Sequence, residues 1–441
     1  MIAAHVQRLA EFLRGSGVAE VVPTEPVHSP AEAQATVAAL RGAAVDAVIV
    51  CQPVFGFPHN AVSIIRDLGL PTLLYAPWEP TYPAVVGVLT IGGGLSQIGL
   101  PHARVWGDLG DPETQKRLLA FIRGAGAVTS LRGGVIGQLG GRSMGLYTTA
   151  ADGALWQAQF GVDLDHADQI EIARRGDAVP EERARAGVEW LSANLGVPYD
   201  GQHLTEAKLL CQVRHYLGTK DLVRDLGWDA VALKCHYEMS EFQVAQCLTA
   251  SLLNDPLDWE GGKAIVPTSC EADADGALTM LALHRISGAP ASLLDVRFYD
   301  RARALYVLSN CGAAPISFAS RGDWKEALGR VSLCPCTSKY LGGGAQLSMV
   351  FAGDYVTVAR LTRGPDGYRM LIGLAKTVEL PPEQVEGAAP IWPHAFLRWD
   401  VEPQDLIEAL EANHVHLVQG DYREELRQFC RFAGVDTVEV G

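Results

Sequence analysis

The chain has 441 residues, 48% hydrophobic and 20% charged, which is typical of a globular protein with a large core. At roughly 150 residues per domain, this length predicts two to three domains. The formal net charge of −15 argues against nucleic acid or an anionic membrane as the main partner. The nine cysteines are odd in number and scattered, so we expect reduced, mostly buried thiols.

The N-terminal segment MIAAHVQRLAEFLRGSG predicts an amphipathic helix, because charged side chains interrupt its apolar positions. It lacks the continuous apolar core of a signal peptide. No stretch of about 18 uninterrupted apolar residues occurs, so no transmembrane helix is expected. Together with the reduced thiols, these features predict a cytoplasmic protein.

Residues 1–128 are predicted to form a first α/β domain. Apolar strands at 45–54 and 71–77 flank a helix at 59–69, and a later capped helix opens with Asp111 and a proline. Strands that alternate with helices predict a doubly wound sheet.

Residues 129–297 predict a second α/β domain. Helices are expected at about 183–195 and 202–226, before a strand at 228–235 and a helix at 240–254. The next segment, IVPTSCEADADGALTMLALHRISGAPASLLDV, has the pattern of a strand, a helix and a strand. This pattern is typical of a βαβ unit, in which the two strands are parallel neighbours.

Residues 298–441 predict a third, β-rich domain. Apolar runs joined by turns such as RGPDG indicate a β-barrel or sandwich, and a helix, a strand and a last helix close the chain. The sequence as a whole predicts an α/β protein with two doubly wound, Rossmann-like domains followed by a C-terminal β-barrel-like domain.

Two carboxylates carry the main functional signal. Glu271 follows an apolar strand at 265–270, and Asp295 lies 24 positions later, in the next predicted strand. One such acid alone more often caps a helix or ends a strand. Two acids at the carboxyl ends of neighbouring parallel strands would share the crevice where open α/β sheets bind ligands. Close carboxylates repel unless a cation or a shared proton intervenes, so the pair predicts a divalent-metal site.

A histidine is the expected third ligand. The segment EANHVHLVQGD offers His414 and His416 at the start of a strand. Alternation along a strand places both on the same face, so periodicity does not choose between them.

Two further segments supply candidate pocket residues. In LKCHYEMSE, Lys234, His236 and Glu238 occupy alternate positions at the end of a predicted strand and would share one face. That face would be a polar wall of the pocket or a solvated edge. In IWPHAFLRW, aromatic side chains that include Trp392 would line a carbohydrate pocket or pack in the core.

In their order and spacing, these motifs resemble the L-fucose isomerase family, within the wider fucose/arabinose isomerase group. The resemblance runs from about residue 127 to the C-terminus and begins at AVTSLRGGVIGQLGGRSMG. It is strongest in CEADADGALTMLALHRISGAPASLLDV, where the family has the same separation between its two acids. It continues through GGGAQ, IGLAKTVELPPE, IWPH and ANHVHLVQGD. The first domain resembles the family only in its α/β character, and the chain is shorter than typical members.

The resemblance implies a metal-dependent aldose–ketose isomerase that works through a cis-enediol(ate) intermediate. It implies that Glu271, Asp295 and His414 hold Mn²⁺ or another divalent cation such as Mg²⁺ or Co²⁺. The two acids would also be the catalytic residues that transfer the proton. The consecutive pair Asn413-His414 matches the family's motif, so the resemblance selects His414 over His416.

The resemblance also implies substrate-binding residues. His236 or Glu238 would occupy the position of a substrate-binding glutamine, Trp392 would fall in a substrate-contacting region, and Asn413 would lie beside the substrate. Ala345 replaces the family's tyrosine after the triple glycine. The expected partner is a small-molecule sugar, free or modified.

Lys234, Arg142 and His236 would form a basic corner for a sulfo- or phospho-sugar. Two other functions remain open, a non-catalytic sugar-binding or regulatory relative and a metal-dependent epimerase or lyase. The family implies a homo-oligomer, a trimer or hexamer, in which the first domain of one subunit caps the site of the next. The loops VFGFPHNAV and YAPWEPTYPAVVG are the candidate caps.

Overall fold

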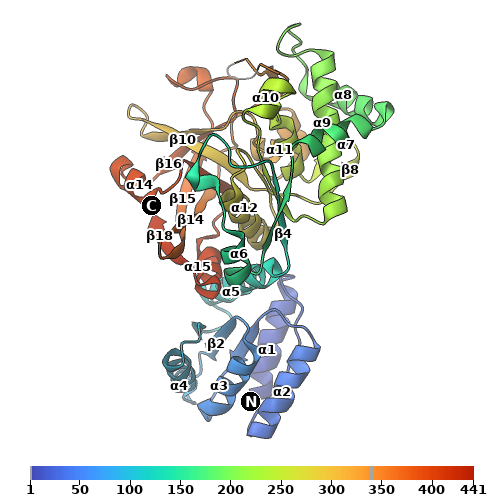
Figure 1. Ribbon diagram of the computed structural model, residues 1–441. Helices are drawn as coiled ribbons and strands as arrows, with labels where there is room; N and C mark the ends of the chain where they lie inside the picture. Colours follow the sequence, from blue (N-terminus) through green and yellow to red (C-terminus); the bar gives the residue numbers. More distant parts are fainter. Residues whose placement is uncertain (1, 338–340) are drawn as a thin grey trace. The chain divides into compact units, whose positions relative to one another are not determined.

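The chain folds into two compact units. A computed structural model describes residues 2–337 and 341–441 (Figure 1). The first unit comprises Met1–Arg132 and Glu424–Val435, and the second comprises Gly133–Arg423 and Asp436–Gly441. The predicted boundaries after residues 128 and 297 stay predictions. No helix in the described part of the chain is long and apolar enough to cross a membrane.

The first unit contains a three-stranded parallel sheet in the order β1-β2-β3. The central strand β2, TLLYAP, is buried at every position, as its continuous apolar run predicts. Asp111 accepts hydrogen bonds from the amides of Glu113 and Thr114, so it caps α5 as expected. The elements are α1 (Ile2–Gly15), α2 (Pro30–Gly42), β1 (Val48–Cys51), α3 (Pro58–Leu68), β2 (Thr72–Pro77), α4 (Ala84–Gln97), β3 (Ala103–Gly107), α5 (Pro112–Leu131) and α15 (Arg423–Ala433).

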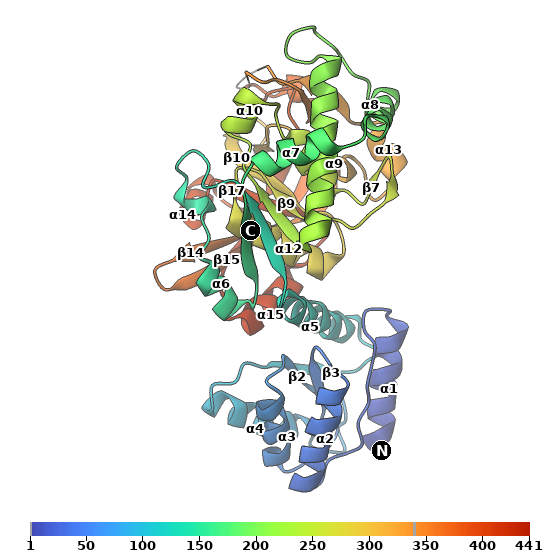
Figure 2. The same cartoon turned by 45° about the vertical axis from the view of Figure 1, so that its right-hand side comes forward.

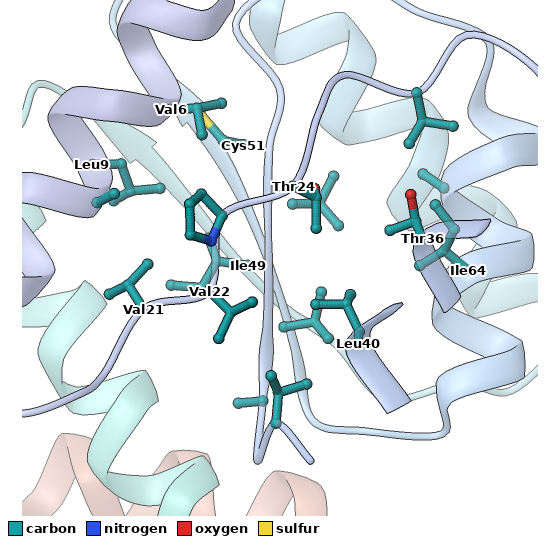
Figure 3. A pocket seen from close by; sticks show the side chains of 18 of the residues that line it. Val6, Leu9, Val21, Val22, Thr24, Thr36, Leu40, Ile49, Cys51 and Ile64 are labelled. Atoms are coloured by element: carbon teal, nitrogen blue, oxygen red, sulfur yellow. The ribbon is translucent and has the colours of Figure 1, made fainter. Parts of the chain in front are cut away.

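An apolar cavity of about 890 Å³ lies inside this first unit (Figure 3). Val6 and Leu9 of α1, Ile49 of β1, Leu40 of α2 and Ile64 of α3 point toward it. The lining is mostly aliphatic.

The second unit contains a four-stranded parallel sheet in the order β5-β4-β6-β9. Helices α7 and α8 pack on the long helix α9, as Figure 2 also shows. The elements up to the last strand of this sheet are β4 (Val135–Leu139), α6 (Gly153–Gln159), β5 (Asp163–Ala167), α7 (Ile170–Ala178), α8 (Glu181–Leu195), α9 (Glu206–Leu226), β6 (Ala230–Leu233), α10 (Glu238–Phe242), α11 (Cys247–Asn254), β7 (Leu257–Asp258), β8 (Gly261–Gly262) and β9 (Thr268–Ser269).

A closed antiparallel barrel of six strands forms the rest of the second unit. The ring runs β14-β17-β10-β11-β16-β15 and closes through the pairing of β14 with β15, while β18 adds to β15 in parallel. The predicted C-terminal barrel is therefore confirmed. The elements are α12 (Ala274–Ser287), β10 (Ser292–Asp300), β11 (Leu305–Ser309), α13 (Trp324–Leu328), β12 (Ser332–Pro335), β13 (Ala345–Ser348), β14 (Tyr355–Gly364), β15 (Gly367–Val378), β16 (His394–Trp399), α14 (Pro403–Ala409), β17 (His414–Gln419) and β18 (Asp436–Val440).

Helix α12 lies between the parallel sheet and the barrel. It contacts β6 and β9 on one side and β14 and β17 on the other, and Figures 1 and 2 both show it in the middle of the second unit. A helix covered on both sides needs apolar residues all round, which explains the run LTMLAL.

The predicted βαβ unit is wrong, although its strand, helix and strand exist. Strand β9 belongs to the parallel sheet, whereas β10 belongs to the barrel and is antiparallel to β11 and β17. The reason is the burial of α12, because a second layer must cover its far side and β10 is part of that layer. The mixed α/β class with parallel sheets is confirmed, and the doubly wound Rossmann detail stays a prediction.

Candidate active site

Glu271 projects from the turn between β9 and α12. Its φ is 59° and that of Ala272 is 52°, so two consecutive non-glycine residues adopt the left-handed region. Such a conformation costs of order 1 kcal/mol or more per residue and persists only where the surroundings enforce it. Here the amide of Ala272 donates to the carbonyl of Leu233 at 3.0 Å and the hydroxyl of Ser269 donates to the carbonyl of Asp273 at 2.5 Å.

Asp295 and His414 lie opposite each other on two neighbouring barrel strands. Their Cα atoms are direct partners in the antiparallel pair of β10 with β17. Nε2 of His414 lies 3.4 Å from Oε2 of Glu271 and 3.7 Å from Oδ1 of Asp295. The structure therefore brings together the three residues named as metal ligands.

His416 lies in the same strand but does not share this contact. It is completely buried beside the first turn of α12, where a Cβ on Gly276 would lie 2.8 Å from its Nε2. Distance from the two acids, rather than the face of the strand, distinguishes the two histidines.

Asp273 holds the other ring nitrogen of His414 and was missed in the sequence. Its Oδ2 lies 2.7 Å from His414 Nδ1 and accepts from Arg360 Nη1 at 2.5 Å. Arg360 also donates to the carbonyl of Thr148 at 2.6 Å, and all three charged side chains are at most 1% exposed. The available signal was an acid at the start of a helix two residues after Glu271. The position of Arg360 in the middle of a β-strand gave no signal.

The electrostatics of this group favour a positive charge at His414. Burial alone would raise the pKa of Asp273, but Arg360 and His414 outweigh it and hold that pKa well below its usual value. Burial alone would lower the pKa of His414, but its contacts with Asp273 and Glu271 raise it to about 10. Burial also raises the pKa of Asp295. Three carboxyl groups thus lie around one imidazole ring.

Asn413 orients Asp295. Its Nδ2 donates to Oδ1 of Asp295 at 3.3 Å, and its Oδ1 accepts from the hydroxyl of Thr148 at 3.4 Å. Asn413 is exposed, so it stands at the open side of the three candidate ligands.

The residues after β6 do not continue the strand, which corrects the expectation for Lys234, His236 and Glu238. Strand β6 ends at Leu233, next to the end of β4, and α10 begins at Glu238. His236 is buried and its Nδ1 lies 3.3 Å from the hydroxyl of Ser240, whereas Glu238 is exposed and pairs with Lys234 at 2.8 Å. The three side chains therefore do not share one strand face.

Trp392 lies beside a cation two positions beyond Asp295. The guanidinium of Arg297 sits 5.1 Å from the centre of its ring, at the bulge in β10. The buried Nε1 of Trp392 and the buried Oε1 of Gln346 both lack a hydrogen-bond partner in the structure. Gln346 lies next to this segment, because its Nε2 donates to the carbonyl of Ile391 at 3.0 Å.

Among the described residues, no three His, Cys, Asp or Glu side chains form a ready-made metal site. The three candidate ligands meet around Nε2 of His414, which is buried and makes no hydrogen bond. Their roles in metal binding, in catalysis and in substrate binding therefore stay predictions.

Comparison with known proteins relates both ends of the chain to one family. Residues 1–133 match the first N-terminal domain of L-fucose isomerase, and residues 308–440 match the C-terminal domain of L-fucose isomerase. The first match corrects the expectation that this part resembles the family only in its α/β character.

Full-length relatives agree with the domain matches. A sulfoquinovose isomerase of Priestia megaterium is 25% identical over 98% of this chain and 94% of its own length. One of Alkalicoccus urumqiensis is 24% identical over 90% of this chain and 86% of its own length. An L-fucose isomerase of Haemophilus influenzae is 24% identical over 68% of this chain and 56% of its own length. The prediction of an aldose–ketose isomerase is confirmed, and the chain belongs to the L-fucose isomerase family.

Proposed function

We propose that this chain is a divalent-metal-dependent sugar isomerase that interconverts an aldose and a ketose through a cis-enediol(ate). One observation carries the proposal. The buried Nε2 of His414 faces Glu271 and Asp295, while its Nδ1 is held by Asp273. In protein metal sites, the ring nitrogen of a histidine that does not bind the metal commonly donates to a carboxylate. This hydrogen bond fixes the orientation of the ring and its tautomer.

The donor set fits a hard divalent cation. Two carboxylates and one imidazole suit Mn²⁺, with Mg²⁺ or Co²⁺ as alternatives. Adjacent donors about 2.2 Å from one octahedral ion lie about 3 Å apart, close to the 3.4 Å and 3.7 Å that separate His414 from the acids. The charge fits as well, since the carboxylates of Glu271 and Asp295 both lie beside Nε2 of His414 and favour a cation there.

The residues of the chain supply the rest of the chemistry. A cation held there would act as a Lewis acid toward charge that develops on the sugar oxygens. A carboxylate beside C1 and C2 takes the proton from one carbon and returns it to the other. Asn413 keeps Asp295 oriented, because its Nδ2 donates to Oδ1 of that acid.

The test is isomerisation in D₂O by metal-stripped protein, with and without added Mn²⁺, followed by NMR. We expect ketose to form only with metal and deuterium to enter at C2 of the aldose. Glu271→Gln should remain folded and lose most of kcat, whereas the exposed Glu383→Gln should match the wild type. Full turnover by Glu271→Gln, or a product without deuterium, would contradict the role of the acids or the enediol(ate) route.

A sugar with an anionic substituent is the substrate class that we favour. Relatives named sulfoquinovose isomerase align with nearly the whole chain, whereas L-fucose isomerases align with 68% of it. Arg297 stands two positions beyond Asp295 and is exposed, and Arg142 is exposed in the loop after β4, 4.6 Å from the ring of Tyr147. Arg297→Met should reduce kcat/KM for sulfoquinovose more than for glucose, which lacks the sulfonate. Equal losses for both sugars would contradict anion recognition by Arg297.

Exposed aromatic side chains in the first unit favour a homo-oligomer. Phe57, Trp78 and Trp106 are each more than half exposed, and the rings of Trp78 and Trp106 stack with their centres 5.0 Å apart. Large exposed apolar patches mark interaction surfaces, and aromatic faces also pack on sugars. Replacing both tryptophans by alanine should lower the oligomer size or raise KM. A variant unchanged in light scattering and in KM would count against this surface.

If the chain were a non-catalytic sugar-binding relative, we would expect at least one of the catalytic residues to have been replaced. Glu271, Asp295 and His414 are all present and in contact, and so is the supporting Asp273. The isomerase is therefore the better supported function.

A further inference from the structure

Strand β1 is an edge strand, and its open edge borders the apolar cavity of the first unit. Among the described strands it pairs only with β2, in the order β1-β2-β3. Strand β2 is buried at every position, whereas the equally apolar VIVC of β1 is only half-buried throughout. Ile49 and Cys51 line the cavity from this strand (Figure 3). One side of an apolar strand is therefore left without a neighbouring strand.

The backbone groups on this edge of β1 point toward the cavity. The amides of Val48 and Gln52 donate to carbonyls on the β2 side, at 2.9 Å and 2.8 Å. Alternate residues of a strand direct their backbone groups to opposite edges, so those of Ile49 and Cys51 face away from β2. In the described part of the chain, no backbone hydrogen bond from a loop reaches these two residues.

The second wall of the cavity is an irregular segment, residues 19–27, which is equally unpaired. It belongs to no helix or strand, and within residues 2–337 and 341–441 no backbone-to-backbone hydrogen bond involves it. Val21, Val22 and Thr24 line the cavity from this segment (Figure 3). Backbone amides and carbonyls are obligatory hydrogen-bonding groups, and one further strand between the two walls would satisfy both sets.

The chemistry of the lining distinguishes a peptide from a plain hydrocarbon. The cavity volume of about 890 Å³ is that of a ligand pocket, and most of the lining is aliphatic. Asn60 also lines it, is only 6% exposed, and has no hydrogen-bond partner for its Oδ1. A hydrocarbon would leave Asn60 and the two backbone walls without partners. A peptide with aliphatic side chains would satisfy the polar and the apolar parts of the lining together.

We propose that this cavity is a slot for one additional strand, filled by an extended aliphatic peptide that runs parallel to β1. All pairs in this sheet are parallel, so the added strand continues the pattern. The mode is the addition of a strand to an open sheet edge, in which backbone hydrogen bonds give affinity and side-chain pockets give specificity. Helix α1 packs on one face of the sheet and α3 on the other, so both faces of the added strand should be aliphatic.

The first turns of α1 lie at the carboxyl end of the slot. Ile2 and Val6 line the cavity, and Val6 lies beside Cys51, the last residue of β1, in Figure 3. A strand parallel to β1 would therefore end close to the beginning of α1. The same peptide joined to α1 through a short loop should reach the slot.

Hydrogen exchange on the full-length protein tests the proposal with a synthetic peptide. The probe has about five valines and isoleucines between two lysines, acetylated and amidated. Without peptide, we expect rapid exchange at Ile49, Cys51 and residues 19–27. Peptide at about ten times its Kd should slow this exchange about ten-fold, because these amides would exchange only after the peptide leaves. The same run joined ahead of Ile2 should give at least this protection, since linkage raises the local concentration.

Two variants and a second peptide provide the controls. Val22→Asp should weaken peptide binding about ten-fold or more, because a carboxylate would face the aliphatic strand. Val86→Asp in α4 is the matched control, since Val86 is 48% exposed, Val22 is 51% exposed, and Val86 lies outside the cavity lining. This variant should bind the peptide as the wild type does. A peptide with proline at alternate positions should not bind, because it lacks those amide donors.

Three results would overturn the proposal. Slow exchange at Ile49 and Cys51 in the free protein would show that these amides already have partners. Equal protection by decanol would assign the cavity to hydrocarbon chains. Unchanged exchange with both the free and the joined peptide would show that no strand enters the cavity. None of these readouts involves a sugar or a metal, so they decide the matter even if the proposed isomerase reaction fails.

Discussion

At the scale of single residues, the two nitrogens of His414 have different neighbours and therefore different roles. Nδ1 lies 2.7 Å from Asp273, and Nε2 faces Glu271 and Asp295. Asp273 is itself held by Arg360 and caps α12 through the amide of Gly276. One buried carboxylate thus orients the ring, neutralises an arginine and starts a helix.

Asp273→Asn is expected to weaken Mn²⁺ binding by about 10- to 100-fold, because the amide no longer fixes the tautomer of His414. It should also destabilise the protein by about 3–5 kcal/mol, since Arg360 would remain buried without its counter-charge. Isothermal titration below the unfolding temperature separates the two effects. A folded Asp273→Asn variant with wild-type Mn²⁺ affinity would show that Asp273 has a structural role only.

Asp275 is expected to make stability fall as the pH rises. Burial is the main cause that raises its pKa to about 6, and Tyr368 and Trp156 both donate to its Oδ1. Because the folded pKa exceeds the unfolded one, the contribution of this group is fully present below about pH 4 and is lost as the pH rises through 6. Raising the pKa of Asp275 from 3.8 to about 6 corresponds to about 3 kcal/mol.

Asp275→Asn isolates this effect, since the amide keeps an acceptor oxygen and does not titrate. Between pH 4 and pH 7 the urea midpoint of the wild type should fall relative to that of the variant. A constant difference between the two proteins over this range would contradict the raised pKa of Asp275.

At the scale of elements, α12 determines the site because it is packed on both sides. Its first turn lies against the side chains that support the candidate ligands. A Cβ at Gly276 would lie 2.6 Å from Oδ2 of Asp273 and 2.8 Å from Nε2 of His416. Contacts this short require those buried side chains to move.

Gly276→Ala is therefore expected to lower Mn²⁺ affinity, although alanine favours a helix by up to about 1 kcal/mol over glycine. The control is Gly93→Ala in α4, where a Cβ meets nothing within 4 Å. That change should raise the free energy of unfolding by up to about 1 kcal/mol and leave Mn²⁺ binding unchanged. If both variants bind Mn²⁺ like the wild type, the turn is more tolerant than its geometry indicates.

The elements also show where pattern reading succeeds and where it fails. The barrel strands β14 and β15 were predicted from their apolar runs, which are long and bounded by a turn. The neighbours of β10 were not predicted correctly, because its apolar run is compatible with a parallel or an antiparallel neighbour. Similarly, the alternation at Lys234, His236 and Glu238 resembled a strand, but β6 ends at Leu233.

At the scale of the whole second unit, the site joins two sheets. Glu271 follows a strand of the parallel sheet, whereas Asp295 and His414 lie on neighbouring barrel strands. A ligand bound by all three links the layers that enclose α12. Binding to the native state alone stabilises it by RT ln(1 + [L]/Kd), about 2.7 kcal/mol at 100 times the Kd.

Hydrogen exchange should detect this link. Mn²⁺ is expected to increase protection at residues 268–276, 292–297 and 413–417 and to raise Tm, and chelation should reverse both. In Glu271→Gln the effect should be much smaller. Increased protection confined to the first unit, or no change in Tm at saturating metal, would place the metal elsewhere.

The sequence by itself determined the mixed α/β class, the C-terminal barrel, the family and the pair of acids with a nearby histidine. These features depend on local apolar runs and on motif spacing, which the chain order preserves. Only the tertiary structure decided that the acids come from two sheets and that Asp273 and Arg360 support the ring of His414. Contacts between distant segments depend on which layers cover α12, and no local pattern specifies that packing.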